Sequence, residues 1–151
     1  MHTIVFGPDW TNTLGVIQCL GADGHDICAL ITGGKTGLVE SSRFVRKVHY
    51  AETMEAAMEL LLNFDCNSSS KVPIVACSDK TASELIRHKE ELTPKYWFEY
   101  VKSNSQYTYA QLLDKHIQLQ LAKEAGVRVP ELYAELCVAG VTPPPRNNSK
   151  Y

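Results

Sequence analysis

Short apolar runs alternate with segments of helical periodicity along roughly the first ninety residues of the chain. Runs that predict β-strands, each ending at a turn-forming residue, cover residues 2–6, 25–31, 44–50 and 72–77. Segments with apolar residues at helical spacing cover residues 11–22, 54–62 and 80–88. Strands that alternate with helices are typical of βαβ units and a parallel sheet. The near-continuous apolar character of the strands indicates burial on both faces. We therefore expect an α/β fold of three layers with a mainly parallel, Rossmann-like sheet.

Polar residues that favour helix N-caps stand in front of the predicted helices. We expect Thr11 or Asn12 to cap the first helix and Thr53 the second. Ser78 and Asp79 follow the fourth strand and are expected to cap the third helix.

The pattern changes after about residue 92. Residues 94–100 are rich in aromatic side chains, and residues 109–124 predict a helix. The end of the chain is rich in Pro, Asn and Ser and lacks a core-forming period, which predicts an extended tail. The expected organisation is a Rossmann-like domain, a connecting helix with the start of a further region, and a linker or tail, at residues 1–106, 107–138 and 139–151.

Four aromatic residues in the segment after residue 94 have two interpretations. Tyr96, Trp97, Phe98 and Tyr100 either pack the edge of the sheet or form a surface that another domain or a second subunit covers. The second interpretation includes a homodimer.

Composition narrows the class of protein. The net charge is -2 without a basic stripe, which argues against nucleic acid or an anionic membrane as the main partner. The five cysteines form no Cys-x-x-Cys pair, so neither a disulfide framework nor a zinc site is indicated. No apolar stretch approaches the ~20 residues of a membrane span, and the N-terminus passes directly into a strand pattern without a signal peptide. The expectation is a soluble cytoplasmic domain.

The loop between the first strand and the first helix is the first candidate for chemistry. It contains Gly7, Pro8, Asp9 and Asn12, and a helix N-terminus at this place favours a phosphate or carboxylate. The spacing is not Gly-x-Gly-x-x-Gly, and no acidic residue ends the second strand, which argues against a dinucleotide. The alternative is an ordinary strand-to-helix turn.

A second glycine-rich loop, residues 33–37, resembles a Walker A loop only superficially. A Walker motif that ends in Gly34-Lys35-Thr36 requires a glycine where the chain has Ala29, and no helix clearly follows. We expect a flexible surface loop.

Four further polar or charged residues remain open to two interpretations. Ser78 and Asp79 either contact substrate or only cap the helix, and Arg43 is either an anion contact or a solvated charge. Lys115 is either a phosphate-seeking cation, with Asp114 orienting it or capping the helix, or a member of a surface charge pair.

Together these segments resemble, in order, the N-terminal portion of an ATP-grasp enzyme. The nearest group is the carbamoyl-phosphate-synthase-like or carboxylate–amine ligases, and the resemblance covers about residues 4–133. The blocks that carry it are residues 14–21 with 24–27, residues 42–45, residues 73–79 with 87–92, and residues 113–115 with 125–130.

The resemblance implies an ATP-dependent ligase in which ATP activates a small carboxylate as an acyl phosphate and an amine or similar nucleophile displaces phosphate. ATP and Mg²⁺ are the cofactors that it implies for the parent enzyme. Lys115 matches a basic position that reaches ATP, and the loop from Gly7 to Asn12, together with Ser78 and Asp79, matches regions that border the substrate. The family's nucleotide-binding lysine and its Mg²⁺ ligands lie downstream of Tyr151.

We therefore expect no catalytic residue and no metal ligand within the chain itself, and no catalysis without a C-terminal ATP-grasp domain as partner. The runner-up is a stand-alone, small-molecule-binding regulatory domain of Rossmann-like fold. A nucleotide-dependent oxidoreductase is a third hypothesis. The missing Gly-x-Gly-x-x-Gly fingerprint argues against it.

Overall fold

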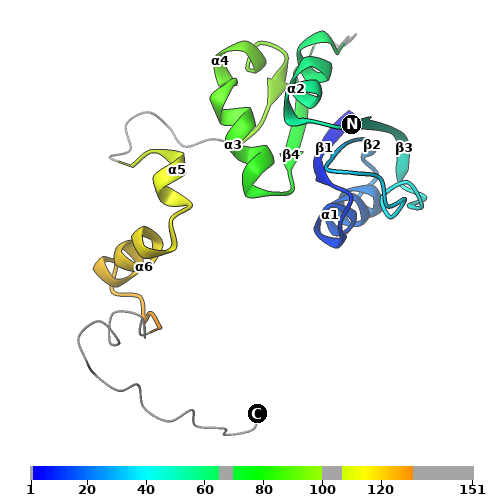
Figure 1. The fold of residues 1–151 in the computed structure, drawn as a ribbon. Coiled ribbons are helices and arrows are strands. Elements are labelled where there is room, and N and C mark those ends of the chain that lie inside the picture. The colour runs from blue at the N-terminus through cyan, green and yellow to red at the C-terminus, as the bar shows by residue number, and fades with distance from the viewer. Residues whose placement is uncertain (1, 65–69, 100–106, 131–151) are drawn as a thin grey trace, which may run out of the picture. The chain divides into compact units, whose positions relative to one another are not determined.

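The computed structural model describes residues 2–64, 70–99 and 107–130 (Figure 1). The chain divides into two compact units, Met1–Gln111 and Leu112–Tyr151, which are described separately. The strands of the first unit are β1 (His2–Pro8), β2 (Asp26–Thr32), β3 (Val45–Ala51), β4 (Val72–Ala76) and β5 (Tyr96–Trp97). Its helices are α1 (Thr11–Ala22), α2 (Met54–Asn63), α3 (Asp79–Arg87) and α4 (Lys89–Leu92), while α5 (Tyr109–Leu112) spans the boundary between the units.

The five strands form one parallel sheet in the order β3-β2-β1-β4-β5. Strand β1 is central, and its Ile4 pairs with Cys28 of β2 on one side and Ile74 of β4 on the other. From β1 the chain adds β2 and β3 in one direction, then crosses back to add β4 and β5 in the other. This reversal makes the junction of β1 and β4 a topological switch point, the place where open parallel sheets bind ligands.

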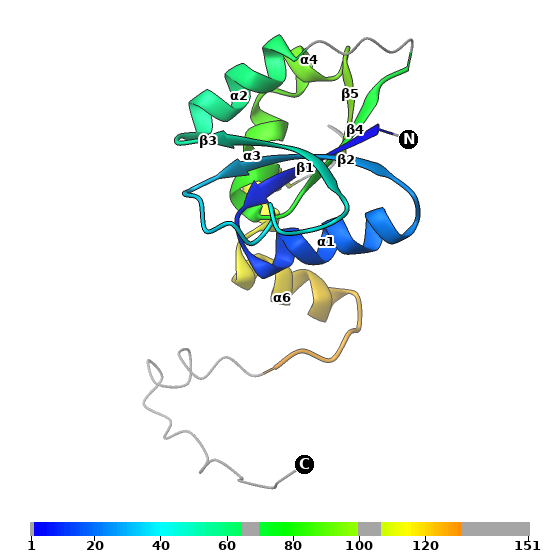
Figure 2. The ribbon, with the colours of Figure 1, turned by 90° about the vertical axis from the view of Figure 1, so that its right-hand side faces the viewer.

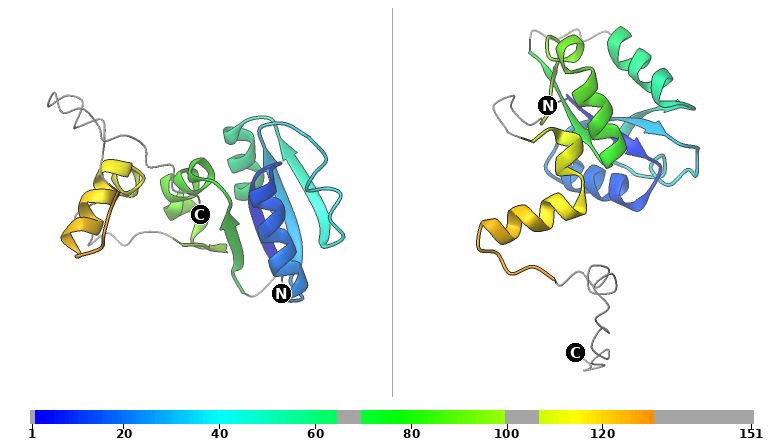
Figure 3. Two further views of the ribbon diagram at one scale, coloured as in Figure 1. Left: turned by 90° about the horizontal axis from the view of Figure 1, so that it is seen from below. Right: turned by 60° about the vertical axis from the view of Figure 1, so that its left-hand side comes forward.

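Helices cover both faces of the sheet (Figure 2). Along β1, Ile4 and Phe6 join the apolar cluster beneath α2, α3 and α4, whereas Val5 joins Ile17 of α1 in the cluster on the opposite face. In the left-hand view of Figure 3, α1 lies in front of β1 and β2 and runs along them. The three-layer α/β fold expected from the sequence is thereby confirmed.

The connection from β2 to β3 crosses the sheet without a helix. Residues 33–44 contain turns, and Val39 is fully buried in the apolar cluster beneath α1. The absence of a helix after the glycine-rich loop, expected from the sequence, is confirmed.

Two of the three predicted helix caps in the first unit are confirmed. The side chain of Thr53 accepts a hydrogen bond from the amide of Ala56, and Ser78 forms a capping box with Thr81. The prediction that Thr11 or Asn12 caps α1 was wrong, because the helix begins at Thr11 and its N-cap is Trp10. The helix starts earlier because the Pro8 carbonyl accepts from both the Trp10 amide, at 2.8 Å, and the Thr13 hydroxyl, at 2.6 Å.

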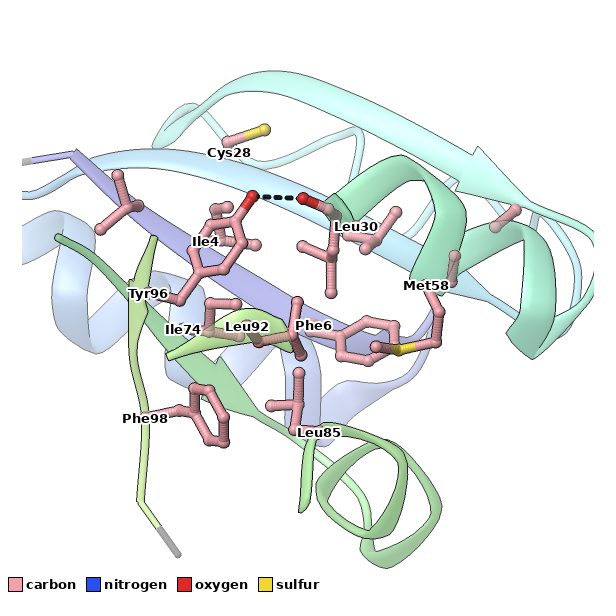
Figure 4. Close-up of a cluster of buried hydrophobic side chains, with 14 residues drawn as sticks. Ile4, Phe6, Cys28, Leu30, Met58, Ile74, Leu85, Leu92, Tyr96 and Phe98 are labelled. Atoms are coloured by element: carbon pink, nitrogen blue, oxygen red, sulfur yellow. Dashed lines mark hydrogen bonds between the residues drawn. The ribbon is translucent and has the colours of Figure 1, made fainter. Parts of the chain in front are cut away.

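The aromatic segment after α4 packs largely inward. Tyr96 is buried in the cluster of Figure 4, where its hydroxyl donates a hydrogen bond of 2.7 Å to the Leu61 carbonyl. Phe98 is also buried, whereas Trp97 is 72% exposed. Packing at the sheet edge is therefore confirmed for Tyr96 and Phe98, and Tyr100 lies outside the described residues.

The second unit is described as far as Pro130 and contains α6 (Lys115–Glu124). The helix expected over residues 109–124 is two helices, α5 and α6, because Asp114 is extended and caps α6 by accepting from the amides of His116 and Ile117. Gly126 follows the C-cap with a φ of 74°, a conformation that favours glycine. The expected tail, residues 139–151, lies outside the described residues. Among the helices of the described segments, none is long and apolar enough to cross a membrane.

At Gly7, β1 lies close to Thr13 of α1 and to Cys77, the residue after β4. A Cβ atom at this position would lie 2.6 Å from the Thr13 hydroxyl oxygen and 2.7 Å from the Cys77 Cβ, whereas a Cβ at Gly15 would meet nothing within 4 Å. Both neighbours of Gly7 are held in place: Thr13 is fully buried, and the Cys77 amide donates a hydrogen bond of 2.8 Å to the Phe6 carbonyl.

We predict that Gly7→Ala lowers the free energy of unfolding by about 1–3 kcal/mol, because the added methyl overpacks this junction. Gly15→Ala is the matched control and is expected to be neutral or to stabilise by up to about 1 kcal/mol, since it lies in α1 with free space around it. Urea denaturation followed by circular dichroism measures both. Equal effects of the two substitutions would contradict the close packing at Gly7.

Candidate ligand site at the carboxyl ends of β1 and β4

Most of the site residues predicted from the sequence lie at one edge of the sheet. Strands β1 and β4 are neighbours and parallel, so the segments that follow them emerge side by side. This places two strand-to-helix connections together at the switch point. Gly7 and Pro8 end β1, Asp9 follows it and Asn12 lies in the first turn of α1, while Ser78 and Asp79 lie at the start of α3, after β4.

Arg43 and Lys115 are not part of this arrangement. Arg43 lies two residues before β3, at the amino end of this edge strand, and its guanidinium lies 4.8 Å from the centre of the Phe44 ring. Lys115 belongs to the second unit, where it is exposed and its Nζ donates a hydrogen bond of 3.0 Å to Gln118. In that unit the capping interpretation of Asp114 is confirmed, and an ATP contact by Lys115 stays a prediction.

Asp9 binds the protein's own backbone. Its side chain accepts hydrogen bonds from the amides of Thr36 at 2.6 Å, Gly37 at 2.7 Å and Val39 at 2.8 Å. The Thr36 hydroxyl also donates to the Asp9 carbonyl at 3.1 Å. With only 3% of its surface exposed, Asp9 ties the β1–α1 loop to the β2–β3 connection, and its carboxylate is already engaged within the fold.

The pKa of the Asp9 carboxyl reflects these contacts. Burial opposes the charged form, but the hydrogen bonds from Val39, Thr36 and Gly37 outweigh it and hold the pKa below its ordinary value. The charged carboxylate is therefore the form that the folded protein stabilises.

The glycine-rich loop that follows β2 is exposed, as expected, but it is fixed at several points. In addition to the Asp9 contacts, Lys35 pairs with Glu40 at 2.8 Å, and the Tyr50 hydroxyl donates to the same Glu40 oxygen at 3.3 Å. The hydrogen bond with Glu40 is the main cause that raises the pKa of Lys35. This lysine is engaged with a carboxylate, unlike the phosphate-binding lysine of a Walker loop.

The two helix N-termini at this edge differ in charge. The α3 N-terminus is closed by the Ser78 capping box and has Asp79 in its first turn. At α1, Trp10 makes no side-chain cap bond, and the first turn has no acidic residue. Thr11 and Asn12 are exposed there. The positive end of the α1 dipole therefore faces solvent unneutralised, which suits an anion.

Sequence reasoning missed three residues of this site. Trp10 is 63% exposed beside the α1 N-terminus, and a large aromatic side chain in an otherwise polar loop was the available signal. Thr13 and Cys77 line the junction at Gly7. Burial raises the pKa of the Cys77 thiol to about 11, against the opposing effect of a hydrogen bond with Thr13, so this cysteine is a packing residue and not a thiolate nucleophile at neutral pH.

No metal site is formed by the residues that the structure describes, since no group of three or more His, Cys, Asp or Glu side chains gathers among them.

Comparison of the chain with protein-family models, with curated proteins and with solved structures gives no match. The site is therefore interpreted from its own geometry.

We predict that Asp9→Asn lowers the free energy of unfolding by about 2–3 kcal/mol at pH 7. In either orientation of the asparagine amide, its NH2 group replaces an accepting oxygen and faces either the amides of Thr36 and Gly37 or the amide of Val39. Urea denaturation of both proteins across pH 3–8 measures the difference.

The stabilisation by Asp9 is expected to depend on pH. Because the pKa of Asp9 is lowered in the folded state, its stabilisation is fully present above the unfolded pKa of about 3.9 and is lost as the pH falls through the folded pKa. The stability gap between wild type and Asp9→Asn should accordingly narrow below about pH 4. Asp23→Asn, at a carboxylate whose side chain is 85% exposed, is the control and should change stability by less than ~0.5 kcal/mol. A gap that is absent at pH 7 would contradict the role of Asp9.

Proposed function

We propose that the first unit is the substrate-side domain of an ATP-dependent ligase of the ATP-grasp type. The small carboxylate substrate binds at the switch point, beside the carboxyl ends of β1 and β4. The observation that carries the proposal is the unneutralised N-terminus of α1 beside the β4–α3 loop. The Rossmann-like fold and the order of the family-like blocks along the chain also support it.

The proposed carboxylate site uses backbone groups of the first turn of α1. The amides of a helix's first turn have no carbonyl partner within the helix, so they bind a carboxylate by charge-assisted hydrogen bonds. The exposed side chains of Trp10, Thr11 and Asn12 surround this position and would contact the rest of the substrate. Asp9 does not repel the substrate strongly, because its charge is compensated by three backbone N–H groups.

In the proposed ligase, ATP supplies the phosphoryl group that activates this carboxylate, and Lys115 contributes to ATP binding. The first unit would hold and orient the carboxylate. The free energy of binding would then offset part of the translational and rotational entropy that is lost when the reactants are brought together. Completion of the reaction requires an ATP-grasp domain as partner, and the chain alone is expected to show no ligase turnover.

The carboxylate site is tested by NMR titration of the chain at low salt with acetate, succinate and L-glutamate, and with acetamide and succinamide as uncharged counterparts. The proposal expects at least one carboxylate to shift the backbone amide signals of residues 11–14, and the amides to leave them unchanged. Asn12→Asp places a negative charge in the first turn and should weaken carboxylate binding by up to about 5-fold. Gln18→Glu introduces the same charge farther along α1 and is the matched control, expected to have little effect.

Equal responses to carboxylates and amides, or none to either, would contradict the carboxylate site. The ligase assignment has a separate test, the sequence of the encoding transcript past the Tyr151 codon. The proposal expects an in-frame continuation with a hydrophobic-Lys-Pro strand, a glycine-rich loop and later Glu and Asn ligands. A stop codon there would favour the stand-alone small-molecule-binding domain.

A further inference from the structure

A cavity of about 660 Å³ lies beside the outer edge of β4, within the first unit. It is lined by residues of β4, α3 and the segment around β5, together with one residue of α5: Pro73, Ile74, Val75, Ala76, Ala82, Leu85, Trp97, Phe98, Glu99 and Tyr109. This volume is within the range of ~300–1,000 Å³ that is usual for small-molecule sites.

The lining combines an apolar floor with exposed aromatic surface. Figure 4 shows Phe98 and Leu85 next to each other at the margin of the buried cluster, below Ile74. Trp97 lines the same cavity with 72% of its surface exposed, and Tyr109 is half-buried. A ligand with an apolar body would cover surface that the described residues leave exposed to water.

The charge in and near the cavity is negative. Of the lining residues within the described part of the chain, Glu99 alone has a formal charge at neutral pH, and it is exposed. Burial and then the negative charges of Asp79 and Glu99 raise the pKa of the Tyr109 hydroxyl, which places both carboxylates within electrostatic reach of the cavity. Among the lining residues that the structure describes, none is a lysine or an arginine.

We propose that this cavity binds an organic ammonium ligand, with the apolar body of the ligand against Leu85 and Phe98 and its ammonium group between Glu99 and the Trp97 indole. Aromatic faces and carboxylates together form the characteristic environment for organic ammonium groups, because the ring quadrupole and the anion both attract the cation. A carboxylate ligand would meet Glu99, and the described lining residues include no cation to compensate it. This cavity and the α1 N-terminus therefore select ligands of opposite charge, and the inference does not depend on the proposed ligase function.

The test uses 2-phenylethylammonium as probe, with 2-phenylethanol as its neutral counterpart and 3-phenylpropanoate as its anionic counterpart. Trp10→Phe removes the other tryptophan of the chain, so that fluorescence reports Trp97 alone. The proposal expects 2-phenylethylammonium to change Trp97 emission saturably and to bind more tightly than the alcohol, and 3-phenylpropanoate to bind most weakly.

Variants in the Trp10→Phe background separate charge from shape. Glu99→Gln should weaken binding of the ammonium probe by about 3–5-fold and leave the alcohol unchanged, whereas Glu90→Gln, at an exposed glutamate that does not line the cavity, should alter neither. Ala82→Phe should fill the cavity and abolish the response to both probes. Circular dichroism melts verify that each variant is folded.

Absence of saturable binding by the ammonium probe would overturn the proposal. So would equal affinity for the ammonium probe and the alcohol, or ammonium binding that is unchanged in Glu99→Gln. The test of the cavity measures Trp97 emission, whereas the test of the carboxylate site measures the amide signals of α1. Failure of one proposal is therefore distinguishable from failure of the other.

Discussion

The carboxylate of Asp9 accepts hydrogen bonds from three backbone amides that lie 27 to 30 positions further along the chain. These bonds fix the β2–β3 connection, which has no helix to hold it against the sheet, and they let Val39 be buried beneath α1. They also determine the chemistry of the neighbouring helix. An acidic residue directly before an N-cap would ordinarily neutralise the helix dipole, but the Asp9 charge is satisfied elsewhere. The α1 N-terminus consequently remains open to an anion.

The N-terminus of α1 and the cavity beside β4 differ in the charge of the groups that they present to a ligand. Helix α1 presents uncapped amides and exposed polar side chains, whereas α3 is closed by Ser78 and carries Asp79 in its first turn. The cavity on the β4 side has a carboxylate and aromatic rings in its lining. The two proposals together give the domain one site for an anionic ligand and one for a cationic ligand, as a reaction that joins a carboxylate to an amine would need.

The sequence predicted those features that depend on local interactions. The caps at Thr53, Ser78 and Asp114 were found because a short polar side chain and its amide partner lie two or three residues apart. Strands β1, β2 and β4 were found because their burial leaves largely apolar runs, whereas the two-residue strand β5 was not predicted. The partners of Asp9 were not found, because no sequence pattern marks a carboxylate that binds a distant loop. Thr11 and Asn12 were wrongly predicted as caps because the turn held by the Pro8 carbonyl starts α1 one residue earlier. The β4 cavity depends on residues from four separate segments, and its lining has no signature in sequence.

The most direct test of this account is amide hydrogen exchange at Thr36, Gly37 and Val39, compared between the wild-type protein and Asp9→Asn. If the Asp9 carboxylate fixes the β2–β3 connection, these three amides exchange slowly in the wild-type protein, although Thr36 is exposed on the surface. In Asp9→Asn they should exchange many times faster, while the amides of β1 and β2 stay protected. Rapid exchange of all three amides in the wild-type protein, or protection that is unchanged in the variant, would contradict the central role of Asp9.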